Sequence, residues 1–510
     1  MAPQMEIKKL AMIGCGSMGG GMALLFAENG VEVSLKDPSE KAMDTILSKA
    51  EKEPHVPKGV IKKYTDYESL CASLGTPKVF VFSLPHGTVG DSVLGDLLPF
   101  LEKGDIIIDA GNEHWQNTER RQGKCVTRGV RYIGMGVSGG YQAARAGPSM
   151  CPGADDESLD MVLPLLKKVC AKDKNGNPCV GKAGTGGAGH YVKMMHNGIE
   201  HGMMSAVAEA FGIMKNGLGM SDEEMGDVFE AWNKDGELRG TFLIWIGADI
   251  CRTKDKSRND EYVLDTVEDK VVQDITGEEG TGIWSNEETI RHHIPGPTLT
   301  TAHYLRLASA DRGQRIRAQE TMGTCFPPQK LELGDSEKKT FLEALQQSVY
   351  VSCLCSYIQG LNVIEQANRS NHWNIDFAAV LQIWRAGCII QADYIADLLQ
   401  PILAQHGKLD SINLLFQKSI MAELKDRFQQ LRKVVVKAVE KDHVVPAMSA
   451  TLEYVKYQVN TELPTSFYEA QLDYFGAHMY DRKGEEGTGA PTEGKYHYEW
   501  KPAHSSKVQG

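Results

Sequence analysis

The sequence predicts an α/β N-terminal domain with a mostly parallel, doubly wound sheet, followed by a large all-α C-terminal domain. Over the first about 180 residues, short β-branched runs alternate with helical segments, which is typical of βαβ units. From residue 187 onward strand signals nearly vanish and long helical segments follow one another. A chain of 510 residues is also too long for one ordinary core. We therefore expect domains at 1–186 and 187–480, and a C-terminal tail at 481–510.

The N-terminal domain is expected to contain five strands, each an apolar run rich in β-branched residues. Their sequences are LAMIG, VEVSLKD, VFVFSLP, DIIIDAGN and RYIGMGV. In the second part the clearest helices are FLEALQQSVYVSCLCSYIQGLNVIEQA and IMAELKDRFQQLRKVVVKAVEK, and the segment around 252–261 is a charged connector. The tail is rich in Gly, Lys and Pro, but its YHYEWKP segment is unusually aromatic. It is either disordered or packed on a partner subunit, and we favour packing.

Composition and charge exclude several classes of function. The net charge of -12 makes nucleic acid and anionic membrane surfaces poor partners. We find no membrane-spanning stretch and no signal peptide, and the eleven cysteines form no Cys-x-x-Cys pair. We therefore expect reduced thiols and a cytoplasmic location. The fifteen histidines lack metal-site spacing, so no metal is predicted.

A dinucleotide site is predicted at the N-terminus, where three glycines have G-x-G-x-x-G spacing. They follow an apolar strand and open a helix at 17–29, which a second strand at 31–36 follows. Such glycines let the backbone approach a pyrophosphate at the positive end of a helix. This makes the segment a Rossmann motif; the alternative is a glycine-rich turn that binds nothing. The expected cofactor contacts are Gly14, Cys15, Gly16, Ser17, Met18, Gly19, Leu84, Pro85, His86 and Asn112.

Asp37 and Pro38 favour NAD over NADP. Asp37 ends the second strand, about twenty residues past the glycines, where an acid accepts hydrogen bonds from the ribose hydroxyls. A 2′-phosphate there would face a carboxylate, at a cost on the order of several kcal/mol. Pro38 stands where an arginine could have paired with that phosphate.

A polar stripe interrupts the apolar segment GAGHYVKMMHNGIEHG, which reads as the start of a buried helix. Its members are Lys193, His196, Asn197 and Glu200, spaced so that they share one helical face. Burial lowers a lysine pKa from about 10.4, so Lys193 could act as a general base, while His196 and Asn197 hydrogen-bond substrate oxygens. The alternative is a satisfied polar network that only fixes helix packing.

Several ordered motifs resemble a known family. GCGSMGGGMA, DAGNEHW (109–115), GVSGGYQAARAGPSMCPGA (136–154) and GGAGHYVKMMHN (186–197) are similar to the four signatures of the β-hydroxyacid dehydrogenases. FEAWNK, GTGIW, IWRAGCII and DYFGAH, further along, resemble the 6-phosphogluconate dehydrogenases in particular. The resemblance covers nearly the whole chain. It implies a homodimer with exchanged tails and oxidative decarboxylation of a 3-hydroxy sugar acid.

The resemblance also implies roles for individual residues. Lys193 would take the proton of the C3 hydroxyl, and Glu200 would protonate the enediol left after carbon dioxide departs. His478 is expected to arrive from the partner subunit. The positions where the substrate carboxylate and its C3 region meet the nicotinamide are Asn112, Ser138, Gly139 and Gly140. The alternative for the glycines is a tight turn.

Departures from the family cluster at the site of the substrate's 6-phosphate. Where the family has a tyrosine, a lysine and an arginine, this chain has His201, Ile283 and Leu472, while Arg306 is kept. A glutamate that meets the sugar hydroxyls is replaced by Tyr141. Loss of two cationic partners costs about 3 to 6 kcal/mol. We therefore expect a sugar acid without the 6-phosphate, oxidised with NAD.

Three alternatives remain open on the sequence. The chain could be a 6-phosphogluconate dehydrogenase with a rebuilt phosphate pocket. It could be a ketone or imine reductase in which Lys193 and Glu200 donate protons and no carboxylate is lost. It could also be a non-enzymatic binding dimer, although retention of both Lys193 and Glu200 argues against that.

Overall fold

A computed structural model describes residues 6–276, 280–405, 413–484 and 494–501. The chain divides into two compact units, Met1–Leu452 and Glu453–Gly510. This division differs from the predicted boundaries at 186 and 480, which follow the change from strands to helices and stay predictions. Of the predicted tail, residues 485–493 and 502–510 lie outside the described residues.

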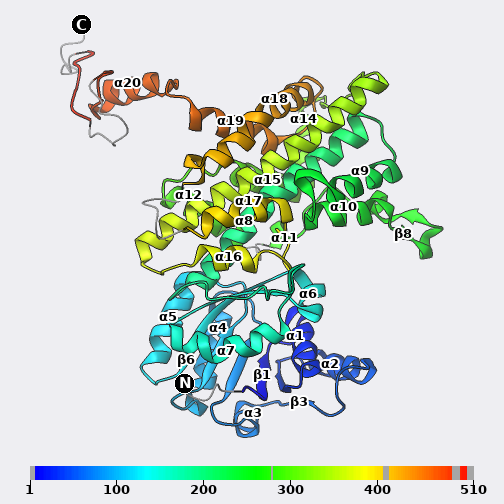
Figure 1. Cartoon of the computed structure of the whole chain (residues 1–510), viewed down its shortest axis with the longest axis vertical. Helices are drawn as coiled ribbons and strands as arrows, with labels where there is room; N and C mark the ends of the chain where they lie inside the picture. Colours follow the sequence, from blue (N-terminus) through cyan, green and yellow to red (C-terminus); the bar gives the residue numbers. More distant parts are fainter. Residues whose placement is uncertain (1–5, 277–279, 406–412, 485–493, 502–510) are drawn as a thin grey trace. The chain divides into compact units, whose positions relative to one another are not determined.

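The first unit begins with a seven-stranded sheet in the order β3-β2-β1-β4-β5-β6-β7 (Figure 1). Its strands are β1 (Lys9–Ile13), β2 (Glu32–Lys36), β3 (Ile61–Lys63), β4 (Val79–Phe82), β5 (Ile106–Asp109), β6 (Arg131–Ser138) and β7 (Ser149–Gly153). All pairs are parallel except β6 with β7, which is antiparallel. The predicted mostly parallel sheet is confirmed. The five predicted strands are present, and the edge strands β3 and β7 add to them.

Helices cover both faces of this sheet, as the alternation of buried side chains in β1 requires. Leu10 and Met12 belong to one core cluster with α1, α2 and α7, whereas Ala11 and Ile13 belong to another with α3, α4 and α5. The helices of this part are α1 (Ser17–Glu28), α2 (Glu40–Lys52), α3 (Tyr67–Ser73), α4 (Thr88–Leu97), α5 (Trp115–Val126), α6 (Gly140–Ala146) and α7 (Asp156–Val169).

The rest of the first unit is helical, as predicted. Its helices are α8 (Ala188–Gly212), α9 (Asp222–Lys234), α10 (Phe242–Arg252), α11 (Gln273–Thr276), α12 (Thr281–Arg291), α13 (Pro297–Ala310), α14 (Arg312–Met322), α15 (Asp335–Asn371), α16 (Phe377–Ile383), α17 (Asp393–Leu403), α18 (Lys418–Glu440) and α19 (Pro446–Val459), the last running into the second unit. The predicted charged connector also carries two short strands, β8 (Lys254–Asp255) and β9 (Glu261–Tyr262). Helix α8 packs along α15 and also against β6 and β7 (Figure 1). Among the described helices, none combines the length and apolar character that a membrane span requires.

The second unit is built around α20 (Thr465–Gly476). Asp473 is fully buried and accepts hydrogen bonds from the backbone of Tyr498 and the side chains of His497 and Trp500. Residues 494–501 therefore fold back on α20. Packing of the tail on a partner subunit stays a prediction.

Candidate active site

The three glycines of the N-terminal motif each meet a different geometric demand. Gly14 has a φ of 96°, and a β-carbon there would lie 2.1 Å from the carbonyl oxygen of Ser83. A β-carbon at Gly19 would lie 2.0 Å from the oxygen of Gly14, so only glycine lets α1 pack this close to β1. At Gly16, the N-cap of α1, a β-carbon would meet open space within 4 Å. This open helix start fits a dinucleotide pyrophosphate.

Asp37 follows β2 and is hydrogen-bonded to the glycine loop. One carboxylate oxygen accepts a hydrogen bond from the backbone N–H of Cys15 at 2.7 Å, and the other from that of Ser39 at 2.8 Å. Burial raises the pKa of the Cys15 thiol to about 12, which keeps the thiol protonated. Ser17 and Met18, also predicted cofactor contacts, form the first turn of α1. An acid at the end of β2 beside this loop matches the position that contacts an adenosine ribose.

Two further predicted cofactor segments, Leu84–Pro85–His86 after β4 and Asn112 after β5, lie in adjacent loops. A β-carbon at Gly111 would lie 2.9 Å from the carbonyl oxygen of Leu84, so the two loops touch. The carboxyl ends of neighbouring parallel strands are where open α/β sheets bind ligands. The described residues at this edge therefore fit a nicotinamide dinucleotide.

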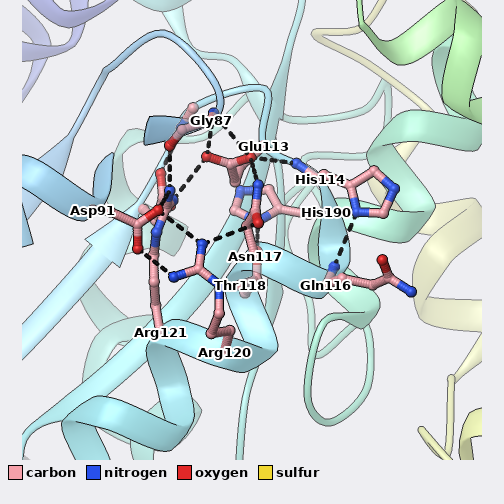
Figure 2. Close-up of polar contacts among 12 residues, drawn as sticks. Gly87, Asp91, Glu113, His114, Gln116, Asn117, Thr118, Arg120, Arg121 and His190 are labelled. Carbon is pink, nitrogen blue, oxygen red and sulfur yellow. Dashed lines mark hydrogen bonds and ion pairs between the residues drawn. The ribbon is translucent and has the colours of Figure 1, made fainter. Parts of the chain in front are cut away.

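A buried ionic network that sequence reasoning missed holds these loops together (Figure 2). The Arg121 guanidinium, from α5, is 1% exposed and donates to Glu113 at 2.8 Å and to the carbonyl oxygen of Gly87 at 2.6 Å. Glu113 in turn accepts the backbone N–H of Gly87 at 3.0 Å. Asp91 and Asp109 also contact Arg121, at 3.2 and 3.4 Å. Because a buried charge needs partners, this network fixes the backbone on both sides of the predicted cofactor residues.

Glycines also seat α8 directly on the sheet. A β-carbon at Gly189 would lie 2.2 Å from the carbonyl oxygen of Gly134, and one at Gly136 would lie 2.3 Å from the β-carbon of Lys193. The polar stripe of α8 therefore begins beside the end of β6. The next turn is equally tight, because a β-carbon at Gly139 would lie 2.4 Å from the carbonyl oxygen of Gly387, while Gly140 faces open space.

The structure brings three of the stripe residues, Lys193, His196 and Asn197, together with Ser138 in one hydrogen-bonded chain, and Glu200 lies beside it. The Lys193 ammonium donates to Asn197 Oδ1 at 2.6 Å. His196 lies 3.1 Å from the same oxygen through Nδ1 and 3.0 Å from Ser138 Oγ through Nε2. Since an amide oxygen only accepts, Nδ1 carries the proton and Nε2 accepts from Ser138. Glu200 lies 3.7 Å from His196 and is 21% exposed.

Burial determines the protonation states of Lys193 and His196 in this hydrogen-bonded chain of side chains. It lowers the pKa of Lys193 from 10.5, against the opposing charge of Glu200. Burial, together with the charge of Lys193, also lowers the pKa of His196 well below its ordinary value, so the ring is neutral. A lysine whose pKa burial lowers, next to a neutral hydrogen-bonding histidine, has the properties that a general base requires.

At the far end of the stripe, His201 contacts the Arg306 guanidinium. Arg306 also pairs with the buried Asp274 at 3.1 Å, and His201 stacks on His303 with ring centroids 5.5 Å apart. Sequence reasoning missed Asp274 and His303, although His303 lies one helical turn before Arg306. Ile283, where the family carries a lysine, is 44% exposed.

Three further residues singled out in the sequence are His478, Leu472 and Tyr141. His478 and Leu472 belong to the second unit. His478 follows α20, with its ring 5.9 Å from that of Phe475. Tyr141, in the first turn of α6, is 68% exposed. Their roles stay predictions.

Comparisons with known proteins match both parts of the chain. The model for the NAD binding domain of 6-phosphogluconate dehydrogenase matches residues 9–183, and that for the 6-phosphogluconate dehydrogenase C-terminal domain matches residues 189–500. A relative from Emericella nidulans, named 6-phosphogluconate dehydrogenase, decarboxylating, is 44% identical over 95% of this chain and 100% of its own length. One from Arabidopsis thaliana, 6-phosphogluconate dehydrogenase, decarboxylating 2, is 35% identical over 98% of this chain and 99% of its own.

Among solved structures, that of Plasmodium falciparum 6-phosphogluconate dehydrogenase superposes with a TM-score of 0.84 at 31% identity. It covers 96% of this chain and 100% of the Plasmodium chain. That protein is described in its apo form and in complex with its cofactor NADP+ and its substrate 6-phosphogluconate.

Proposed function

The chain belongs to the 6-phosphogluconate dehydrogenase family, and from that premise we propose that it oxidises and decarboxylates a 3-hydroxy sugar acid with a nicotinamide cofactor. The observation that carries the proposal is the buried Lys193, whose pKa is lowered by burial and whose ammonium donates to Asn197. A neutral amine in this position can take the proton of a substrate hydroxyl.

The side chains divide the reaction between them. Lys193 removes the proton of the C3 hydroxyl, and the bound nicotinamide supplies the hydride acceptor. The resulting 3-keto acid loses carbon dioxide, and the electrons of the broken C1–C2 bond form an enediol as the Lys193 ammonium returns its proton to the C3 oxygen. Glu200 then gives a proton to C2 while Lys193 takes the C3 hydroxyl proton again, and Ser138, His196 and Asn197 hold substrate oxygens.

For the cofactor, we propose a preference for NAD. Asp37 lies beside the glycine loop, where its carboxylate can accept hydrogen bonds from ribose hydroxyls and would repel a 2′-phosphate. We expect wild type to favour NAD over NADP in kcat/KM by about a hundredfold, and Asp37→Asn to lower that ratio at least tenfold. Equal use of both cofactors by wild type would contradict this preference.

For the substrate, we propose a gluconate-type acid without a terminal phosphate. Ile283 is 44% exposed where the family has a lysine, and a dianion beside it would lack a cationic partner. The charge of Arg306 is also paired with Asp274. An uncharged hydroxyl end suits this surface better than a phosphate does.

A second candidate substrate is 6-phosphogluconate itself. It is favoured by Arg306, whose guanidinium contacts His201 at the end of the stripe, and by the names of the relatives. A phosphate could share Arg306 with Asp274, because a guanidinium offers five donors.

Steady-state kinetics with gluconate and 6-phosphogluconate, each with NAD and NADP, separate the two. The phosphate-free proposal expects gluconate or a related aldonate to have the higher kcat/KM, with one carbon dioxide released for each cofactor reduced. Efficient turnover of 6-phosphogluconate alone would select the second candidate. Cofactor reduction without carbon dioxide would reject both.

A further inference from the structure

Helix α12 touches both predicted cofactor loops through one side chain, Trp284. Its ring meets that of His86, in the loop after β4, with centroids 5.1 Å apart and planes at 82°. It meets that of His114, which follows β5, at 5.0 Å and 84°. Edge-to-face contacts of this geometry are favourable and depend on ring position. The indole therefore responds to the position of either loop.

The two loops form one unit because Arg121 and Glu113 tie them together (Figure 2). Arg121 holds the carbonyl of Gly87, one residue after His86, and Glu113 immediately precedes His114. A displacement of either loop would leave buried charges unpaired, which is strongly unfavourable. The loops therefore move together or not at all.

The same helix touches the catalytic stripe one turn away from Trp284. Thr281, at the first position of α12, accepts a hydrogen bond from Asn197 Nδ2 at 2.8 Å, and Asn197 holds the Lys193 ammonium. Positions three apart on a helix lie on neighbouring parts of one face and move as a rigid body. Tyr191 of α8, which donates to Glu288 of α12 at 3.1 Å, fastens the rest of the helix.

We propose that Trp284 is a positioning residue that couples the cofactor loops to the general base, through Thr281 and Asn197 to Lys193. The proposal rests on the function proposed above. A cofactor that orders the loops sets the position of α12, and α12 sets the amide that holds the lysine. Because coupling between two sites is reciprocal, a sugar acid bound near Lys193 changes cofactor affinity by the same factor.

Titration of the reduced cofactor tests this without turnover, since NADH and a sugar acid do not react. The dissociation constant of NADH is measured by its fluorescence, with and without saturating gluconate or 6-phosphogluconate. We expect the sugar acid to change that constant about tenfold in wild type, and less than twofold in Trp284→Leu. Trp284→Phe, which keeps an aromatic ring, should retain most of the coupling. Trp245→Leu, an exposed tryptophan on α10, should behave as wild type.

A second variant keeps the proposal testable if Trp284→Leu does not fold. His114→Asn removes the ring contacts of His114 with Trp284 and Trp115 but keeps a side-chain acceptor for the backbone N–H of Gln116 at the start of α5. It should reduce the coupling factor about threefold with an unchanged melting temperature. Full coupling in Trp284→Leu, or no coupling in wild type, would overturn the proposal. Turnover that survives Lys193→Met would instead reject the proposed chemistry, but it would not affect the measured coupling between sugar-acid and NADH binding.

Discussion

Helix α8 carries two buried charged groups with different surroundings, Lys193 near its start and Glu209 near its end. Glu209 is 4% exposed and accepts three hydrogen bonds, from Ser205 Oγ and from the backbone N–H groups of Ala447 and Met448. Lys193 is 9% exposed and donates one hydrogen bond, to Asn197, among the described residues. An ammonium has three donors, so Lys193 keeps capacity for a substrate, whereas most of the acceptor positions of the Glu209 carboxylate are occupied.

Burial pushes both groups towards neutrality, but with different consequences. It lowers the pKa of Lys193 and raises that of Glu209 to about 7. Glu209 caps the start of α19, where a carboxylate offsets unpaired N–H groups of a helix. A shifted pKa alone therefore does not mark a catalytic group. Unused hydrogen-bonding capacity, as on the Lys193 ammonium, is what distinguishes the two groups.

Replacement of Lys193 should give the largest difference in kcat between the two groups, Lys193 and Glu209. Lys193→Met keeps the length of the side chain but removes the base, so kcat should fall roughly 10²- to 10⁴-fold. Its melting temperature should not fall, because the cost of burying a charged ammonium is removed. Glu209→Gln is the matched control and should keep kcat within about twofold. Equal losses of kcat in both variants would contradict a catalytic role that belongs to Lys193 and not to Glu209.

Glu200→Gln tests the other end of the stripe. The oxidation step should survive because Lys193 is intact, whereas protonation after carbon dioxide loss should slow, lowering kcat roughly 10²-fold. In heavy water, wild type should place deuterium stereospecifically on the carbon that lost the carboxylate, and the variant should not. Stereospecific labelling by Glu200→Gln would assign the acid to another group.

The free energy of unfolding should depend on Glu209, whereas kcat should depend on Lys193. The folded-state pKa of Glu209 is raised from 4.5 to about 7, so the folded protein holds this proton more tightly than the unfolded chain. Its contribution to stability is therefore lost as pH rises from 4.5 through 7. Relative to wild type, Glu209→Gln should gain roughly 3 kcal/mol in unfolding free energy over that window. Denaturant midpoints at pH 5 and pH 8 measure the gain, and a constant difference would refute it.

What could be predicted from the sequence was set by local patterns. The glycine spacing and the flanking strands located the dinucleotide motif, and helical periodicity placed Lys193 and His196 on one face. The edge strands β3 and β7 were missed because IKK is short and SMCPG contains small residues and a proline rather than a β-branched run.

The ionic network and the Trp284 contacts could not be predicted in this way. Gly87, Asp91, Glu113 and Arg121 come from separate loops and helices, so no single periodicity relates them. Trp284 lies about 170 residues beyond His114 and meets it only through tertiary packing. Helical periodicity could have predicted the position of His303, since it precedes Arg306 by one helical turn.

The pH dependence of catalysis gives the smallest and most specific test. Only deprotonated Lys193 can act as the base, so kcat/KM should rise with pH and reach half its maximum below 10.5, the ordinary lysine value. The Asn197 oxygen stabilises the charged form, so Asn197→Ala should lower the lysine pKa further and shift the rising limb to lower pH by about one unit. Glu209→Gln should leave the limb in place, because Glu209 lies near the other end of α8 and bonds to the start of α19. A limb that stays fixed in Asn197→Ala would mean that the titrating base is not the lysine that Asn197 holds.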